Sequence, residues 1–113
     1  GVVLFPGAEK CINVYPLVEW RKLAGTLTGG PLSRDKLRKL NRAIFAMAFN
    51  VTMDGQGRVA LPVPLREHAE IVEDVVIAGA NTYLEIWDQA LWEEEKVNSL
   101  KQAWQIIESL ERH

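Results

Sequence analysis

The sequence predicts an α+β fold for this chain of 113 residues. Short apolar runs that end at glycine or proline, such as residues 2–5 and 75–78, are typical of strands. Longer stretches with apolar residues three or four positions apart, above all the one after Asp88, are typical of amphipathic helices. The chain contains 48% hydrophobic and 25% charged residues, the balance of one small globular domain.

The first elements are two strands and a helix. Residues 2–5 are apolar, residues 6–10 carry turn formers, and residues 11–15 return with Ile12 and Val14 on one face. Pro16 ends the second strand, and residues 17–27 place Trp20, Leu23 and Ala24 at helical spacing. These patterns predict a β-hairpin followed directly by a short helix.

A basic amphipathic helix is expected next. Ser33 is a favourable N-cap residue, and the helical pattern continues from there to residue 47. The helix carries an apolar stripe and a basic stripe. These stripes consist of Leu37, Leu40, Ile44 and Met47, and of Arg34, Arg38 and Arg42.

Residues 51–61 predict a hairpin with a sharply bent tip. Strand patterns at 51–53 and 59–61 flank Asp54, Gly55, Gln56, Gly57 and Arg58. Both glycines can adopt positive φ, and the Asp54 carboxylate can accept backbone N–H bonds in the turn. We therefore expect the tip to present one fixed guanidinium, that of Arg58. The alternative is a turn in which Asp54 and Arg58 do no more than close the hairpin.

The last third of the chain predicts a short helix, two strands and a long helix. Pro62 and Pro64 introduce the short helix at residues 65–70, and strands follow at 75–78 and 83–87. Asp88 is an N-cap residue for the final helix. We expect the apolar stripe of this helix to pack internally, with oligomer contacts as the alternative. The stripe consists of Leu91, Val97, Leu100, Trp104, Ile107 and Leu110.

The chain also matches itself after a shift of 72 residues. Residues 3–20 then align with 75–92 without a gap, so that Tyr15 meets Trp87 and Trp20 meets Trp92. The positions that would match Asp54 fall before the start of the sequence, so the first repeat is expected to be incomplete. This pattern predicts the C-terminal part of a first repeat in residues 1–30, a connecting basic helix in 31–48, and a second repeat with its C-terminal helix in 49–113.

The net charge is −2, but acidic and basic residues are distributed unevenly along the chain. Residues 67–113 contain eleven acidic and three basic residues, whereas residues 21–66 contain two acidic residues and nine basic ones. The nine are Arg21, Lys22, Arg34, Lys36, Arg38, Lys39, Arg42, Arg58 and Arg66. A basic centre in an acidic protein favours a surface that faces a polyanion, and a solvated helix face is the alternative.

Few residues favour an enzyme or a membrane protein. Cys11, the single cysteine, lies in an apolar strand pattern and is expected to be a buried, inert thiol, and His68 is expected at the surface. We find no metal-ligand spacing, nucleophile elbow or phosphate loop, and we expect no enzymatic activity and no cofactor. No apolar run approaches the roughly 20 residues that span a bilayer.

These segments together resemble the MraZ family of bacterial transcriptional regulators. The family's hairpin and the segment after it are matched by Asp54-Gly55-Gln56-Gly57-Arg58, Leu61-Pro62 and Leu65-Arg66-Glu67. Its two aromatic segments are matched by Tyr15-Pro16-Leu17 with Glu19-Trp20 and by Glu85-Ile86-Trp87 with Trp92-Glu93-Glu94. The resemblance implies an α+β fold of AbrB/SpoVT-like swapped-hairpin barrel units with flanking helices, in two pseudo-repeats of which the first lacks its hairpin.

The resemblance also implies a function. It indicates a cytoplasmic, nucleoid-associated DNA-binding regulator, expected to be a repressor, that forms a homo-oligomeric ring on tandem promoter repeats of the division and cell-wall gene cluster. Arg58 is expected to contact bases, on a loop formed with Asp54, Gly55, Gln56 and Gly57. Phosphate contacts are expected from Arg66, Arg38 and Arg42. Two alternatives are an oligomeric protein-interaction module without DNA binding and an antitoxin-like regulator of the AbrB type.

Overall fold

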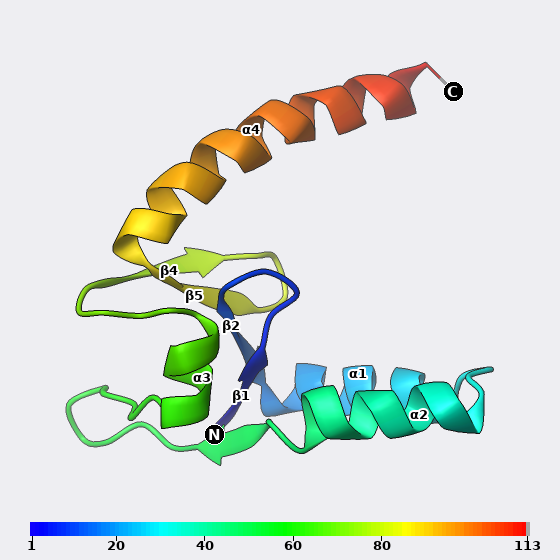
Figure 1. Cartoon of the computed structure of the whole chain (residues 1–113), viewed down its shortest axis with the longest axis vertical. Helices are drawn as coiled ribbons and strands as arrows, with labels where there is room; N and C mark the ends of the chain where they lie inside the picture. The colour runs from blue at the N-terminus through cyan, green and yellow to red at the C-terminus, as the bar shows by residue number, and fades with distance from the viewer. Residues whose placement is uncertain (113) are drawn as a thin grey trace.

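The computed structural model describes residues 1–112, which build a five-stranded antiparallel sheet in the order β3-β1-β2-β5-β4 with four α-helices around it (Figure 1). The elements are β1 (Val2–Pro6), β2 (Ile12–Pro16), α1 (Leu17–Gly29), α2 (Arg34–Leu40), the π-helical turn η1 (Asn41–Phe45), β3 (Phe49–Val51), α3 (Val63–His68), β4 (Val75–Gly79), β5 (Leu84–Asp88) and α4 (Gln89–Glu111). The predicted α+β fold is confirmed.

Two β-hairpins form the centre of the sheet. β1 pairs with β2 and β4 pairs with β5, as the turn residues between them predict. The hairpins join through β2 and β5, where Ile12 lies opposite Ile86 and Val14 lies opposite Leu84. This antiparallel register brings Ile12, Val14 and Ile86 into one core, whereas Leu84 and Ile77 of the second hairpin stay exposed.

Helix α3 closes this core from one side. Leu65 and Ala69 are fully buried against Leu4, Ile12 and Ile86. The helix is short, and no capping side chain supports its N-terminus. Its position therefore depends on the apolar contact with the sheet, which also fixes the chain that enters it.

A second apolar cluster holds α1 and η1 against the sheet. The Trp20 ring on α1 lies 5.0 Å from the Phe5 ring and 5.5 Å from the Phe45 ring, measured between ring centres. Tyr15 packs edge-on against Phe5 at 4.8 Å. Aromatic pairs at these distances stabilise beyond their buried area.

The structure confirms both predicted helix caps. The Ser33 hydroxyl accepts a hydrogen bond from the Lys36 N–H at 3.3 Å. The Asp88 carboxylate accepts from the Ala90 and Leu91 N–H groups and also from the Val72 N–H at 3.2 Å. Asp88 thus starts α4 and ties the segment before β4 to the sheet.

The two strands predicted for the hairpin over residues 51–61 are wrong: of 51–53 only Val51 lies in a strand, and of 59–61 no residue does. The strand β3 ends at Val51 and pairs with β1, with Leu4 opposite Phe49, whereas residues 59–61 form no strand. Val59 and Leu61 pack against the core instead. An isolated two-stranded ribbon is only marginally stable in water, and Pro62 lacks the N–H that a ladder requires.

The predicted basic helix up to residue 47 is also interrupted. Helix α2 ends at Leu40, and η1 follows, with the Ala46 N–H donating to the Asn41 carbonyl oxygen at 2.8 Å. One extra residue in a helical turn rotates the side chains after it about the helix axis. The turn thereby brings Phe45 against Trp20, a tertiary contact that the helical spacing alone does not predict.

Two side-chain expectations are corrected as well. The apolar stripe of α4 does not pack internally beyond the half-buried Leu91, because the rest of the stripe is exposed and α4 curves away from the sheet (Figure 1). His68 is half-buried, and its Nε2 lies 3.2 Å from the Gly7 carbonyl oxygen and 3.0 Å from that of Glu9. The imidazole therefore tethers α3 to the turn between β1 and β2.

Within residues 1–112, no helix combines the length and the apolar character that crossing a bilayer requires.

Candidate nucleic-acid interface

The 54–58 loop lies at an edge of the molecule. It belongs to the connection between β3 and α3, which extends from the sheet in the direction opposite to α1 and α2 (Figure 1). All five of its residues are exposed. The paired strand β3 fixes one end of this connection, and the buried side of α3 fixes the other.

Hydrogen bonds within the loop close it. The Asp54 N–H donates to the Arg58 carbonyl oxygen at 2.9 Å, and the Gly57 N–H donates to the Asp54 carbonyl oxygen at 3.1 Å. The Asp54 Oδ1 atom accepts from the N–H groups of Gln56 at 2.8 Å and Arg58 at 2.9 Å. The predicted capping role of Asp54 is therefore confirmed.

Glycine is required at one of the two predicted positions. Gly57 has φ of 77°, in the left-handed region where a Cβ is disfavoured. Gly55 is not among the residues with positive φ, so only Gly57 uses the backbone freedom that both glycines have. The Asp54 carboxylate supplies the bonds that bend the chain there, so this position needs no special backbone conformation.

The Asp54 carboxylate also holds the Arg58 guanidinium. Asp54 Oδ2 lies 2.9 Å from Arg58 Nε, while the Arg58 side chain remains 71% exposed. Among the described residues, Asp54 is the one ion-pair partner of Arg58, and the terminal Nη groups of Arg58 form no hydrogen bond there. A guanidinium has five N–H donors, so Arg58 keeps donors available for a ligand.

The Asp54 carboxyl carries the charge on which this arrangement depends. The N–H groups of Arg58 and Gln56, followed by the Arg58 side chain, lower the pKa of the Asp54 carboxyl below its ordinary value. The stabilisation that these bonds provide is fully present above the pKa of an unfolded Asp, about 3.9, and is lost as the pH falls through the lowered pKa. The loop is thus closed at neutral pH.

The other predicted contact residues are not gathered around Arg58. Arg66 lies on α3 beside Glu67 and Glu70, which line the same shallow depression. Arg38 forms an ion pair with Asp35 on α2, and Arg42 lies on η1. Since α2 and the loop extend in opposite directions, the structure separates the basic helix from Arg58 (Figure 1).

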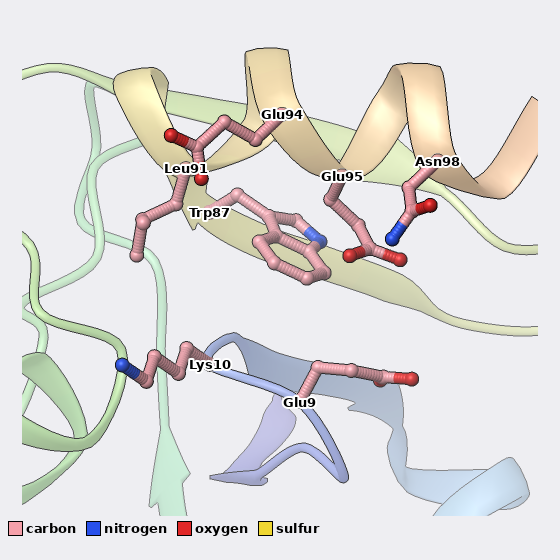
Figure 2. Close-up of a pocket in the computed structure, with 7 residues that line it drawn as sticks. All are labelled: Glu9, Lys10, Trp87, Leu91, Glu94, Glu95 and Asn98. Atoms are coloured by element: carbon pink, nitrogen blue, oxygen red, sulfur yellow. The ribbon is translucent and has the colours of Figure 1, made fainter.

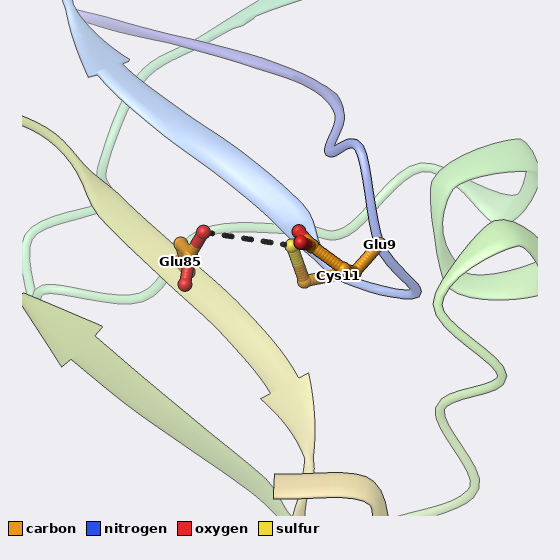
Figure 3. Close-up of side chains that lie close together, drawn as sticks. All are labelled: Glu9, Cys11 and Glu85. Carbon is orange, nitrogen blue, oxygen red and sulfur yellow. Dashed lines mark hydrogen bonds between the residues drawn. The ribbon is translucent and has the colours of Figure 1, made fainter. Parts of the chain in front are cut away.

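A thiol and two carboxylates meet at a second site, between the β1–β2 turn and β5 (Figure 3). The ligand atoms of Glu9, Cys11 and Glu85 lie within 4.8 Å of one another, and the Cys11 thiol contacts the Glu85 carboxylate at 3.9 Å. Burial, together with the negative charges of Glu85 and Glu9, raises the pKa of the Cys11 thiol to about 12. The predicted buried thiol is confirmed, and this cluster keeps it protonated at neutral pH.

We expect Cys11 to react slowly with a thiol-specific reagent at pH 8 in the folded chain and rapidly in the unfolded chain. The thiolate is the reactive form, and an unfolded thiol has a pKa of about 8.5, whereas burial and the two carboxylates raise the pKa of the folded thiol to about 12. A Glu85→Gln variant, which loses one negative charge, should be labelled faster. Equal labelling rates for folded and unfolded chains at pH 8 would contradict this explanation.

The same difference in pKa affects the stability of the fold. The free energy of unfolding should fall as the pH rises between these two pKa values, since only the unfolded chain releases the thiol proton there.

A hollow of about 350 Å³ lies between the β1–β2 turn and α4, and the sequence patterns do not predict it (Figure 2). Trp87 forms its floor and donates from Nε1 to Glu85 at 3.2 Å. Glu9, Glu94 and Glu95 line it. Lys10, on its rim, is paired with Glu70 at 2.6 Å. The excess of carboxylates disfavours a nucleic acid at this face.

Comparison with known proteins identifies relatives of this chain. The family model described as "MraZ protein, putative antitoxin-like" matches residues 44–107, which include the 54–58 loop, α3 and the β4–β5 hairpin. A protein named Transcriptional regulator MraZ from Dehalococcoides mccartyi strain BAV1 is 54% identical over 114 residues, covering 100% of this chain and 80% of the relative.

Two further relatives carry the same name. One, from Dehalococcoides mccartyi strain 195, is 53% identical over 98% of this chain and 79% of its own length. The other, from Salinispora tropica, is 41% identical over 82% of this chain and 66% of its own length. These names agree with the expectation of a protein that is not an enzyme. The chain belongs to the MraZ family, because the relative from strain BAV1 is 54% identical over the whole chain and the family model matches residues 44–107.

Proposed function

We propose that this chain is a transcriptional regulator that binds double-stranded DNA through the 54–58 loop. One observation carries the proposal: the loop's own hydrogen bonds fix the Arg58 guanidinium at an exposed edge, and within residues 1–112 its terminal Nη groups form no hydrogen bond. An arginine held in this way loses little conformational entropy on binding. The relatives named Transcriptional regulator MraZ support the same function.

Arg58 is the residue proposed to read bases. A guanidinium can donate two hydrogen bonds to the major-groove edge of guanine, and such a contact is worth about 1–3 kcal/mol of discrimination. Asp54 positions Arg58 and does not contact DNA, because its oxygens already accept from Gln56 and Arg58. Gly55 and Gly57 keep the tip narrow enough to approach a groove.

Phosphate contacts are proposed for Arg66, Arg38 and Arg42. Such contacts fix the position of a protein on DNA without reading sequence. Because α2 and the loop extend in opposite directions, Arg38 and Arg42 are assigned to a separate stretch of backbone from the one near Arg58 (Figure 1). Arg66, on the helix that follows the loop, is assigned to the phosphates that flank the base contact.

The finer features are proposed on the family resemblance. We infer a homo-oligomeric repressor, cytoplasmic and nucleoid-associated, that acts on the division and cell-wall gene cluster and binds tandem short repeats. One loop with one free guanidinium binds weakly. Several loops in one oligomer raise the effective concentration at neighbouring repeats, so affinity increases without any new contact.

We expect Arg58→Ala to weaken binding to labelled DNA with tandem repeats about tenfold or more, since one bidentate contact is worth about 1–3 kcal/mol. The slope of log K against log salt should also become shallower by about one for each phosphate that the variant no longer neutralises. Asp54→Asn, which keeps an acceptor for the backbone but not the ion pair, should give a smaller loss. Binding is measured by fluorescence anisotropy at several salt concentrations.

Arg112→Ala is the matched control, because it removes an exposed guanidinium at the end of α4. It should leave DNA affinity unchanged. Equal effects of the Arg58 and Arg112 substitutions would mean that only net charge matters, and the proposed role of Arg58 would be rejected.

A second candidate function is an oligomeric protein-interaction module without DNA binding. The exposed apolar stripe on α4 favours it. Salt separates the two functions, because DNA binding weakens steeply with rising salt whereas an apolar contact does not. The family description as antitoxin-like adds a partner protein as a third possibility, which co-purification tests.

A further inference from the structure

Three possible metal ligands from the two hairpins meet at the turn between β1 and β2 (Figure 3). Glu9 and Cys11 belong to this turn, and Glu85 lies on β5, which pairs with β2. The Cys11 sulfur and one oxygen of each carboxylate all lie within 4.8 Å of one another. Ligand atoms of one zinc ion lie roughly 3.5 Å apart, since zinc binds sulfur at about 2.3 Å and oxygen at about 2.0–2.2 Å. Small rotations of the two glutamate side chains close this gap.

The Cys11 thiol is buried, and the hydrogen bonds that it forms within residues 1–112 are long. The residue is 0% exposed, and its sulfur faces two oxygen atoms, Asn13 Oδ1 and Glu85 Oε2, each at 3.9 Å. A thiol has a single proton and is a weak donor, so it cannot satisfy both oxygens at this distance. A cation bound beside the sulfur explains why a buried thiol faces oxygen atoms without a close hydrogen bond.

The two carboxylates lack a positively charged partner in the described part of the chain. Within residues 1–112, neither Glu9 nor Glu85 forms an ion pair. Lys10, between Glu9 and Cys11 in the chain, is paired with Glu70 at 2.6 Å instead. Carboxylates that lie close together repel each other, and a cation between them removes this repulsion. The charge of the cluster therefore favours a bound cation.

The surrounding sheet holds one of the carboxylates in place. Trp87 Nε1 donates to Glu85 Oε1 at 3.2 Å, whereas Glu85 Oε2 contacts the Cys11 sulfur. Carboxylates that bind metals in proteins are commonly oriented by such a second hydrogen bond. Asn13 lies opposite Glu85 in the ladder between β2 and β5, and its Oδ1 atom contacts the same sulfur. Part of the cluster is thus positioned before any ion binds.

We propose that Glu9, Cys11 and Glu85 bind one divalent cation of the zinc class through one sulfur and two oxygen atoms. On binding, the Cys11 S–H bond breaks, the sulfur electron pair forms the bond to the metal, and the proton passes to solvent. The Asn13 Oδ1 atom is available for the fourth position of a tetrahedral site. The thiolate ligand favours zinc and cadmium over magnesium and calcium, which prefer oxygen ligands.

The ion connects the turn after β1 to β5 and therefore links the two hairpins of the sheet. A ligand that binds the folded chain more tightly than the unfolded chain stabilises the fold. Metal binding should thus raise the melting temperature. None of the proposed ligands belongs to the 54–58 loop, so this site is independent of the proposed contact with DNA.

Cadmium absorption tests the sulfur ligand. A bond between Cd²⁺ and a thiolate gives a charge-transfer band in the ultraviolet, and Cys11 is the single cysteine, so this band reports on this site alone. Titration of the folded chain at neutral pH should saturate at one Cd²⁺ per chain. Excess Zn²⁺ should remove the band, whereas excess Mg²⁺ should not. The absence of the band in excess Cd²⁺ would overturn the proposal.

Two substitutions test the carboxylate ligands. Glu9→Gln and Glu85→Gln should each raise the dissociation constant for Cd²⁺ about tenfold or more, because each removes a charged ligand. Glu85→Gln keeps an oxygen acceptor for Trp87 Nε1, and Glu9 is exposed, so both variants should fold. Glu94→Gln is the matched control, because it removes the same charge from the adjacent hollow and should leave the dissociation constant nearly unchanged. Equal effects of all three substitutions would mean that only net charge matters, which rejects the site.

Thermal unfolding tests the link between the hairpins. Saturating Zn²⁺ should raise the melting temperature of the unsubstituted chain by about 4 °C or more, and a chelator should reverse this shift. Cys11→Ser removes the sulfur ligand and should lose most of the shift. A melting temperature that Zn²⁺ leaves unchanged, or an equal shift in Cys11→Ser, would show that the ion does not bind here.

Discussion

Replacing Leu65 with alanine should lower the free energy of unfolding by about 2–5 kcal/mol. Leu65 is 0% exposed and contributes to the core that Leu4, Ile12 and Ile86 form on the sheet. Truncation removes buried methyl groups and leaves a cavity that the paired strands cannot fill by moving. A small domain has a total stability of about 5–15 kcal/mol, so the loss is a large fraction of it.

Urea denaturation followed by tryptophan fluorescence measures this loss. The midpoint should fall while the dependence on denaturant stays constant. Val63→Ala on the same helix is the matched control, because Val63 is 53% exposed and should change stability by less than about 0.5 kcal/mol. A Leu65→Ala variant with the stability of Val63→Ala would show that α3 does not depend on its apolar side.

The consequences of Leu65→Ala for the 54–58 loop follow from where its hydrogen bonds lie. The bonds that fix Arg58 are formed within the loop, by Asp54, Gln56 and Gly57. The buried contact of α3 determines instead where the loop lies on the molecule. Local closure of the loop should therefore survive the substitution for as long as the chain is folded.

Features set by neighbouring residues in the chain could be predicted from the sequence. The β1–β2 and β4–β5 hairpins, the caps at Ser33 and Asp88, and the turn centred on Asp54 all depend on contacts between nearby residues. The hydrophobic pattern and turn chemistry determine such contacts directly.

Features set by distant residues could not be predicted in this way. Residues 59–61 have a strand pattern, yet they lie without a pairing partner beside the core. Phe45 on η1 packs against Trp20, and His68 is half-buried beside carbonyl groups of the β1–β2 turn, and in both cases the partner lies far away in the sequence. The apolar spacing in α4 predicts a buried face, yet α4 contains no buried residue, because the spacing itself holds no information about what would cover that face.

The second large effect is expected at Gly7, where an alanine should cost about 3 kcal/mol, the upper end of the usual range for overpacking. Gly7 is buried in the turn after β1, and its N–H donates to the Cys11 carbonyl oxygen at 2.9 Å. A Cβ at this position would overlap the Cys11 sulfur atom and approach the Asn13 Oδ1 atom to 3.2 Å. This free-energy cost is steric, since the turn must open to accommodate the methyl group.

A double-mutant cycle in urea denaturation tests this explanation. Cys11→Ala removes the sulfur that the methyl group would overlap, so Gly7→Ala should cost less in that background, with a coupling energy of about 0.5–3 kcal/mol. Gly79→Ala is the matched control, because nothing lies within 4 Å of a Cβ built there, and its effect should stay within about 0.5 kcal/mol. If Gly7→Ala costs the same with and without the Cys11 sulfur, the crowding lies elsewhere in the turn. If it costs no more than Gly79→Ala, the turn has room for a side chain, and the tight packing of Gly7 against Cys11 is rejected.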